Sequence, residues 1–381
     1  MKKAYLDNAS TTPLRQEVIA EMVKVMEENY GNASSTHSFG RNAKTVLETA
    51  RKLIAKCINA DAREIIFTSS GTEADNWILR SAVKDLGIKR IITAKTEHHA
   101  VLNVVEALQS EYHIQVDYVK TELNGTICLT SLQELLSQET PTLVSLMHVN
   151  NETGVVLDLV KIGEMCREYK ALFHSDTVQS VGKERIDVQQ LPIDFMVASA
   201  HKFHGPKGVG FAYVKKNSGL KAMIYGGEQE KGVRAGTEGI HQIAGMAKAL
   251  DVAVENLDEE REYITSLKKY CLEQLDTYFP GYKINGADKS SNIENTFYNI
   301  LNVLLPLPEE KTAMILFHLD MKGIAVSRGS ACQSGSIKPS HVLNEMLNDE
   351  DIKKPSLRIS FSHFNTKEDI DMLIEALKSL Q

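Results

Sequence analysis

Short apolar runs alternate with helical patterns along the chain between about residues 60 and 214. The apolar runs are residues 64–68, 90–93, 143–147, 171–174, 196–198 and 209–214. Most of them lead into a short polar cluster and then into apolar residues at helical spacing. Strands that alternate with helices predict a parallel or mostly parallel α/β sheet, with the polar clusters gathered at one edge.

The two ends of the chain follow other patterns. Helices are predicted over residues 14–29, with Thr12 as cap, and over residues 41–59. A long helical pattern runs from residue 240 to about 278, and its charged stretch 258–262 is interpreted as a break between domains. Beyond it, strands are predicted over residues 295–303, 323–327 and 356–362, followed by a last helix capped by Thr366. This final part therefore predicts a separate α+β segment.

The composition narrows the possible functions. The 381 residues are 43% hydrophobic and 24% charged, as in ordinary globular proteins, and the net charge is −7. That charge, without a Lys/Arg-rich block, argues against a nucleic-acid partner. No signal peptide or membrane-spanning run is expected. The five cysteines contain no CxxC pair, which predicts reduced thiols, a cytoplasmic location and no structural zinc site.

The stretch 196–210, MVASAHKFHGPKGVG, predicts a strand, a tight turn and a second strand. Lys202 lies on the turn between His201 and His204. Burial and neighbouring positive charge would lower the pKa of this lysine and make its amine nucleophilic, as a Schiff-base lysine requires. The alternative is a solvated lysine on a surface turn.

Other polar clusters also follow predicted strands. Residues 69–76 lie between a strand and a helix start, where free backbone N–H groups can bind a phosphate, although an ordinary helix cap has the same pattern. His98 and Asp176 follow strands at the edge where α/β sheets bind ligands. A structural histidine and a helix-capping aspartate are the alternatives. Asp176 is expected to be too buried to stay charged without a cationic partner.

Cys332 lies in a loop of small polar residues, RGSACQSGS, which starts at Arg328. Such surroundings are unlike those of an inert core thiol, and Arg328 would favour the thiolate. Cys332 is therefore a candidate nucleophile, with an incidental exposed thiol as the alternative.

Taken together, the motifs resemble those of the class I cysteine desulfurases, in the class V group of the fold-type I aminotransferase superfamily. The matching motifs run nearly from end to end in the same order: YLDNASTTP at Tyr5, GNASSTHSFG at Gly31, FTSSGTEADN at Phe67, KTEHHAV at Lys95, MHVNNETG at Met147, HSDTVQSVGK at His174, SAHKFHGPKGVG at Ser199, RAGTEG at Arg234, GSACQSGSIKPSHVL at Gly329 and LRISFS at Leu357. Their order and spacing are far more specific than any single motif.

The resemblance implies an α/β fold of fold type I. A large domain over residues 13–255 would hold a mostly parallel sheet of the seven-stranded type, flanked by helices and carrying pyridoxal 5′-phosphate. Residues 1–12 and 256–381 would form a small α+β domain that carries a mobile cysteine loop over about residues 326–340.

The resemblance also implies the residues that hold the cofactor. Lys202 would form the Schiff base, and Asp176 would keep the pyridine nitrogen protonated so that the ring accepts electrons. His98 would stack on the ring and take part in proton transfer. The remaining cofactor contacts would come from Gly71, Thr72, Ser199 and His201 at the phosphate, Thr237 of a second subunit, and Asn151 and Gln179 at the ring substituents.

For the substrate, the resemblance implies L-cysteine, with Arg358 and Asn151 at its carboxylate. Cys332 would receive the sulfur as a persulfide and release alanine. It could also bind an iron–sulfur cluster transiently, although no resident metal is expected. A homodimer with a shared active site and an acceptor protein for iron–sulfur assembly or thiolation are implied. Two alternatives stay open: a selenocysteine lyase or other class V enzyme, and a non-catalytic sulfur carrier.

Overall fold

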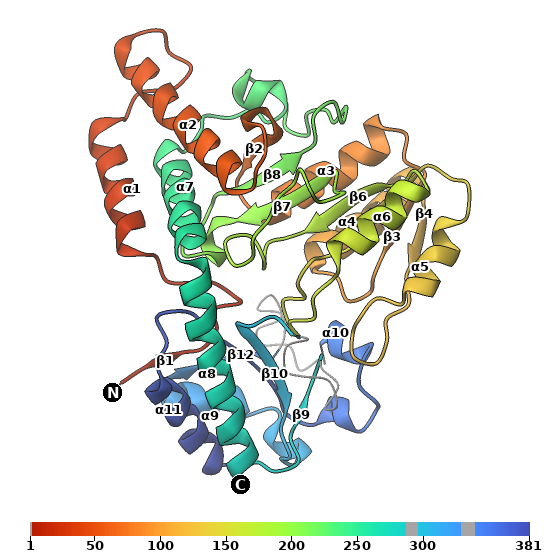
Figure 1. Ribbon diagram of the computed structural model, residues 1–381, viewed down its shortest axis with the longest axis vertical. Helices are drawn as coiled ribbons and strands as arrows, with labels where there is room; N and C mark the ends of the chain where they lie inside the picture. The colour runs from red at the N-terminus through yellow and green to blue at the C-terminus, as the bar shows by residue number, and fades with distance from the viewer. Residues whose placement is uncertain (1, 287–295, 329–339) are drawn as a thin grey trace.

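The computed structural model describes residues 2–286, 296–328 and 340–381, so that Cys332 lies outside the described residues. A seven-stranded sheet forms the upper part of the molecule (Figure 1), in the order β2-β8-β7-β6-β5-β3-β4. Its strands are β2 (Ile65–Thr68), β3 (Arg90–Thr93), β4 (Gln115–Tyr118), β5 (Thr142–Ser145), β6 (Leu172–Asp176), β7 (Phe195–Ser199) and β8 (Gly210–Val214). Strand β8 runs opposite to the other six strands of this sheet, which confirms that the sheet is mostly parallel.

Helices cover both faces of this sheet because its strands are apolar on both sides. Helices α3 (Gly71–Asp85) and α4 (His99–Tyr112) pack on the face that carries Ile66, Ile91 and Phe195. The other face, with Phe67, Ile92 and Met196, is covered by the helices α2 (Ser38–Cys57), α5 (Leu129–Leu136), α6 (Leu159–Glu168) and α7 (Ile240–Glu255). The two cores lie on opposite sides of the sheet, since neighbouring strand residues point to opposite faces.

The first helix does not begin as predicted. Helix α1 covers Gln16–Glu28, and its N-cap is Arg15 rather than Thr12. The hydroxyl of Thr12 instead donates to the carbonyl of His201 at 3.0 Å and accepts the N–H of His204 at 2.8 Å. Thr12 therefore joins the N-terminal segment to the turn that carries Lys202.

The C-terminal part forms smaller sheets with their own apolar core. The strand β10 (Ile300–Leu304) pairs antiparallel with β9 (Lys283–Ile284) and β12 (Ser356–Ser360), while β1 (Ala4–Tyr5) pairs parallel with β11 (Ile324–Ala325). The helices here are α8 (Leu257–Tyr278), α9 (Ile315–Met321), α10 (His341–Asn344) and α11 (Lys367–Lys378), and Thr366 caps α11 as predicted. Short 3-10 turns are η1 (Ala62–Glu64), η2 (Ala200–Lys202), η3 (Gln229–Gly232), η5 (Glu309–Lys311) and η7 (Asp351–Lys353).

Helices α7 and α8 meet at Asn256, which ends the one and begins the other. The predicted break at residues 258–262 is therefore wrong by a few positions. Three acidic residues of that stretch occupy the first turn of α8, where the positive end of the helix dipole stabilises them. The separate cores above and below this junction support the division into residues 13–255 and 1–12 with 256–381, which stays a prediction.

No described helix combines the length and the apolar character that crossing a bilayer would require.

A buried ion pair anchors turn η3 to the edge strand β2. Glu230 is 5% exposed, and its carboxylate lies 2.6 Å from Nη2 of Arg51. The same carboxylate accepts the N–H of Phe67 at 2.8 Å, while Arg51 also donates to the carbonyl of Ile65. The pair fixes the strand that leads into α3.

Replacing Glu230 by alanine should lower the free energy of unfolding by about 3–5 kcal/mol, because Arg51 would remain buried without its carboxylate. Chemical denaturation of both proteins measures the change. Glu228→Ala, at an exposed position two residues away, is the matched control and should stay within about 0.5 kcal/mol of the native protein. Equal losses in both variants would contradict this account of the pair.

Candidate active site

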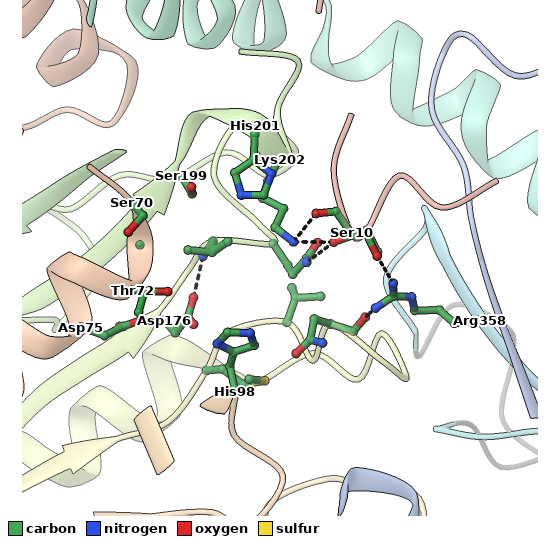
Figure 2. Close-up of a pocket in the computed structure, with 17 residues that line it drawn as sticks. Ser10, Ser70, Thr72, Asp75, His98, Asp176, Ser199, His201, Lys202 and Arg358 are labelled. Carbon is green, nitrogen blue, oxygen red and sulfur yellow. Dashed lines mark hydrogen bonds between the residues drawn. The ribbon is translucent and has the colours of Figure 1, made fainter. Parts of the chain in front are cut away.

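A cavity of about 230 Å³ opens at the carboxyl ends of the parallel strands. Every predicted cofactor and substrate residue among the described ones lines it, except Thr237: Gly71, Thr72, His98, Asn151, Asp176, Gln179, Ser199, His201, Lys202 and Arg358. Figure 2 shows Lys202 and His201 on one wall, Asp176 and Thr72 on a second, and Arg358 on a third. Parallel strands bring their ends to one edge, which explains why residues from such distant motifs meet here.

The amine of Lys202 is held by the N-terminal segment. Turn η2 places this side chain directly after β7, and its Nζ donates to the carbonyl oxygens of Ala9 at 2.7 Å and Ser10 at 2.9 Å. The backbone N–H of Thr12 also donates to the carbonyl of His201 at 2.9 Å. Lys202 thus faces the cavity from a fixed turn, and the solvated-lysine alternative is wrong.

The histidines beside Lys202 do not supply the positive charge that the sequence suggested. Burial, with a smaller effect from the Lys202 charge, lowers the pKa of His201 to about 4. Burial likewise lowers the pKa of His204 to about 3, and its Nδ1 lies 2.8 Å from the carbonyl of Pro13. Both rings are therefore neutral at pH 7, because neither finds an anion in its buried position.

Lys183 is a nearby basic group that the sequence analysis did not single out. It is 7% exposed, and burial followed by the charge of Lys202 lowers its pKa to about 7. Its Nζ donates to Oε1 of Gln179 at 3.3 Å, and Gln179 donates to the carbonyl of Ala9 at 2.9 Å. The signal was present, since Lys183 closes the motif HSDTVQSVGK that also holds Gln179.

Asp176 lies at the end of β6 and accepts the N–H of Val178 at 2.9 Å. Burial raises the pKa of its carboxyl group, while His98 and Lys202 counteract the shift. His98 caps α4, and its Nδ1 accepts the N–H of Ala100 at 3.1 Å, so that the neutral ring carries its proton on Nε2. Burial lowers the pKa of His98, with Asp176 opposing.

The start of α3 forms a cradle for an anion. Ser70 caps the helix by accepting the N–H of Glu73 at 3.1 Å, and the first N–H groups of a helix have no partner inside it. At Gly71 a Cβ atom would lie 2.6 Å from Cγ2 of Val178, so that only glycine leaves this approach open. Ser199 and His201 line the cavity beside it. These donors fit a phosphate group.

Together with Lys202 and Asp176, this cradle fits pyridoxal 5′-phosphate. The cofactor needs an amine for its aldehyde, an acid for its ring nitrogen and donors for its phosphate. The cavity presents all three kinds of group.

Arg358 reaches the cavity from β12 of the small sheet. It is 1% exposed, and its Nη1 donates to the carbonyl of Asn151 at 2.8 Å. Its Nη2 lies 2.8 Å from the carboxylate of Asp7 and also donates to the hydroxyl of Ser10. Its Nε donates to no group that the structure describes, which leaves a buried donor for an anionic ligand.

One described residue that the sequence predicted for the site, Thr237, does not line this cavity. Thr237 is exposed and lines a separate cavity of about 140 Å³, together with Ser69 and Arg234. Its contribution from a second subunit stays a prediction. Cys332 lies outside the described residues. The described residues hold no group of three or more side chains that could bind a metal ion.

Known proteins resemble this chain over its whole length. The family model described as Aminotransferase class-V matches residues 4–373. The chain is 38% identical to the cysteine desulfurase IscS of Dictyoglomus turgidum, with 100% of this chain and 94% of that relative covered. It is 41% identical to the cysteine desulfurase IscS of Pseudoalteromonas translucida, with 98% and 92% covered.

Solved structures agree with the sequence relatives. A NifS-like protein superimposes with a TM-score of 0.89 at 33% identity, with 99% of both chains covered. SspA, in a complex with cysteine, superimposes with a TM-score of 0.81 at 30% identity, with 95% of this chain and 100% of that chain covered. The chain therefore belongs to the class-V aminotransferase family and, within it, to the cysteine desulfurases.

Proposed function

We propose that the protein converts L-cysteine to L-alanine and transfers the sulfur to Cys332. The observation that carries the proposal is the placement of Lys202, Asp176 and Arg358 on separate walls of one cavity. These residues supply an amine, a buried acid and a carboxylate-binding guanidinium. Full-length relatives with the same activity in their names support the reaction.

Pyridoxal 5′-phosphate is the cofactor of this family, and when bound it supplies an aldehyde for the substrate amine and an electron-accepting ring. In our proposal the start of α3, with Ser199 and His201, holds its phosphate. Asp176 meets the ring nitrogen, and His98 lies against the ring. Asn151 and Gln179 hold the ring substituents, and Lys183 keeps Gln179 oriented.

Lys202 would act as the proton carrier. Its Nζ, held by the carbonyls of Ala9 and Ser10, removes the proton from the α-carbon of the bound cysteine. Arg358 orients the substrate by binding its carboxylate, with Asn151 beside it. His98 on the neighbouring wall assists the proton transfers.

The thiolate of Cys332 would then attack the sulfur of the substrate. A sulfur–sulfur bond forms to Cys332 while the bond between the β-carbon and sulfur breaks, and the carbon keeps the electron pair. Protonation of that carbon yields the methyl group of alanine. In net terms, cysteine and the Cys332 thiol become alanine and a Cys332 persulfide.

The same proposal includes partners and location. Thr237 would complete the phosphate site of a second copy of the chain, since it is exposed and does not line the cavity of its own chain. A sulfur-acceptor protein would take the persulfide sulfur for iron–sulfur assembly or thiolation. A cytoplasmic location is supported by the cysteines, because the four described ones are all unpaired.

Replacing Lys202 by alanine should lower alanine formation by about 10³-fold or more, because the proton carrier is lost. The visible absorbance of the lysine-linked cofactor should disappear as well. Lys207→Ala, an exposed position near the same turn, is the matched control and should retain both properties. An unchanged spectrum in Lys202→Ala would rule out its covalent role.

Replacing Cys332 by serine should leave cofactor binding intact but abolish sulfide release in the presence of a thiol reductant, because a hydroxyl cannot take up the sulfur. Cys128→Ser serves as the control and should behave like the native protein. Full sulfide release from Cys332→Ser would remove the nucleophile from the proposal. If Cys332→Ser retained activity on selenocysteine but not on cysteine, a selenocysteine lyase would be favoured.

Replacing Arg358 by lysine should raise the KM for cysteine by about 10–100-fold, because an ammonium group cannot make the same paired contacts. Steady-state kinetics with a separate cofactor titration measures the effect, and cofactor affinity should hardly change. Arg185→Lys, at a side chain that is 67% exposed, is the control. A KM equal to that of the native protein would argue against carboxylate binding by Arg358.

A further inference from the structure

Three buried polar side chains form a line from the cavity wall into the sheet. Asp75 of α3 lines the cavity on the same side as Asp176 (Figure 2). Its Oδ1 lies 3.3 Å from Nε2 of His174 on β6. Nδ1 of His174 lies 2.9 Å from the hydroxyl of Ser145 on β5. The roles proposed above for the cavity residues leave this line unused.

The local structure explains why these side chains meet. His174 and Asp176 are two residues apart on one strand and therefore point to the same face of the sheet. Helix α3 packs on that face, and Asp75 lies about one turn beyond Gly71 at its start. Asp75 is thus fixed beside both side chains of β6.

Asp75 has poor surroundings for a negative charge. It is 1% exposed, and neither carboxyl oxygen accepts a hydrogen bond of standard geometry from any described group. Burial raises the pKa of Asp75 well above its ordinary value, and the carboxyl groups of Asp176 and Glu97 raise it further. An ionised carboxylate in this position would be strongly destabilised, because no described donor or cation replaces the water that it loses.

His174 cannot compensate for such a charge. Burial lowers the pKa of its completely buried ring to about 3, so that the ring is neutral at pH 7. Helix α3 also packs on α4, β2, β7 and β8. The titratable side chains of those elements are His99, Glu106, Glu111, Tyr112 and Tyr213. None of them contributes to the raised pKa of Asp75.

Asp176 is also buried, and burial raises the pKa of its carboxyl group, but unlike Asp75 it has partners that oppose this shift. It accepts the N–H of Val178, and His98 and Lys202 both favour its charged form. When two neighbouring acids have such different partners, their pKa values move apart, so that one is neutral and the other is ionised.

We propose that Asp75 is a protonated carboxylic acid that donates its hydrogen to Nε2 of His174, whose Nδ1–H donates to Ser145. Asp75 is then a positioning residue, because it leaves the negative charge of this wall on Asp176. If Asp75 were ionised, its negative charge would favour the protonated form of Asp176. A protonated Asp176 could no longer keep the ring nitrogen protonated. This inference rests on the proposed function, which gives Asp176 that role.

Infrared difference spectroscopy of the holoenzyme tests the protonation state directly. The native protein minus Asp75→Asn should show the carbonyl stretch of a protonated carboxylic acid at pH 7. Asp85→Asn, a half-buried acid at the end of the same helix, is the matched control and should remove no such band. If the Asp75-dependent band is missing, the proposal is overturned.

Cofactor affinity provides a second readout. Asp75→Asn exchanges one neutral donor for another and should change the dissociation constant of pyridoxal 5′-phosphate by less than about threefold, whereas Asp176→Asn should weaken binding by about tenfold or more. A change at Asp75→Asn as large as that at Asp176→Asn would contradict a neutral Asp75.

Nitrogen-15 NMR of histidine-labelled native protein keeps the test independent of any variant. His174 should be a neutral ring protonated on Nδ1, and an imidazolium signal would overturn the proposal. Neither spectroscopic readout depends on turnover. If no alanine forms while the Asp75 band is present, the proposed function fails and the inference about Asp75 stands.

Discussion

The amine of Lys202 is held in the cavity by backbone carbonyl groups of a segment almost two hundred positions earlier in the chain. Ala9 and Ser10 accept its hydrogen bonds, and Thr12 joins the same segment to the Lys202 turn. The carbonyl of Ala9 also accepts a hydrogen bond from the side-chain amide of Gln179, which in turn accepts one from Lys183. One short N-terminal stretch therefore fixes the lysine and an amide that faces the same cavity.

The cavity lies where the large sheet meets the small one, and each supplies a different part of the site. The large sheet contributes the strand ends with Asp176 and Lys202. The small sheet contributes Arg358, which donates to the carbonyl of Asn151 and to the carboxylate of Asp7. Because the contact with Asn151 crosses from the small sheet to the part of the chain that forms the large one, packing of the two parts determines where a substrate carboxylate would bind.

Burial determines the charges around the cavity more than direct ion pairing does. His201 and His204 are neutral because they lack anionic partners, while the pKa of Lys183 falls to about 7. The carboxyl groups of Asp75 and Asp176 lie on one wall in unlike surroundings. In a low-dielectric site each contact with a donor or a cation has a large effect, so that chemically identical side chains take different protonation states.

The sequence by itself determined the alternation of strands and helices, the cluster of polar strand ends and the importance of Lys202, because apolar periodicity and turn chemistry are local properties. It misplaced the cap at Thr12 and the helix break near Asn256, where tertiary contacts and helix geometry override local preference. Tertiary structure alone decided the partners of Lys202, the contact of Lys183 with Gln179 and the line from Asp75 to Ser145. Those features depend on which side chains meet after folding and on how little water reaches them, and neither is encoded in local spacing.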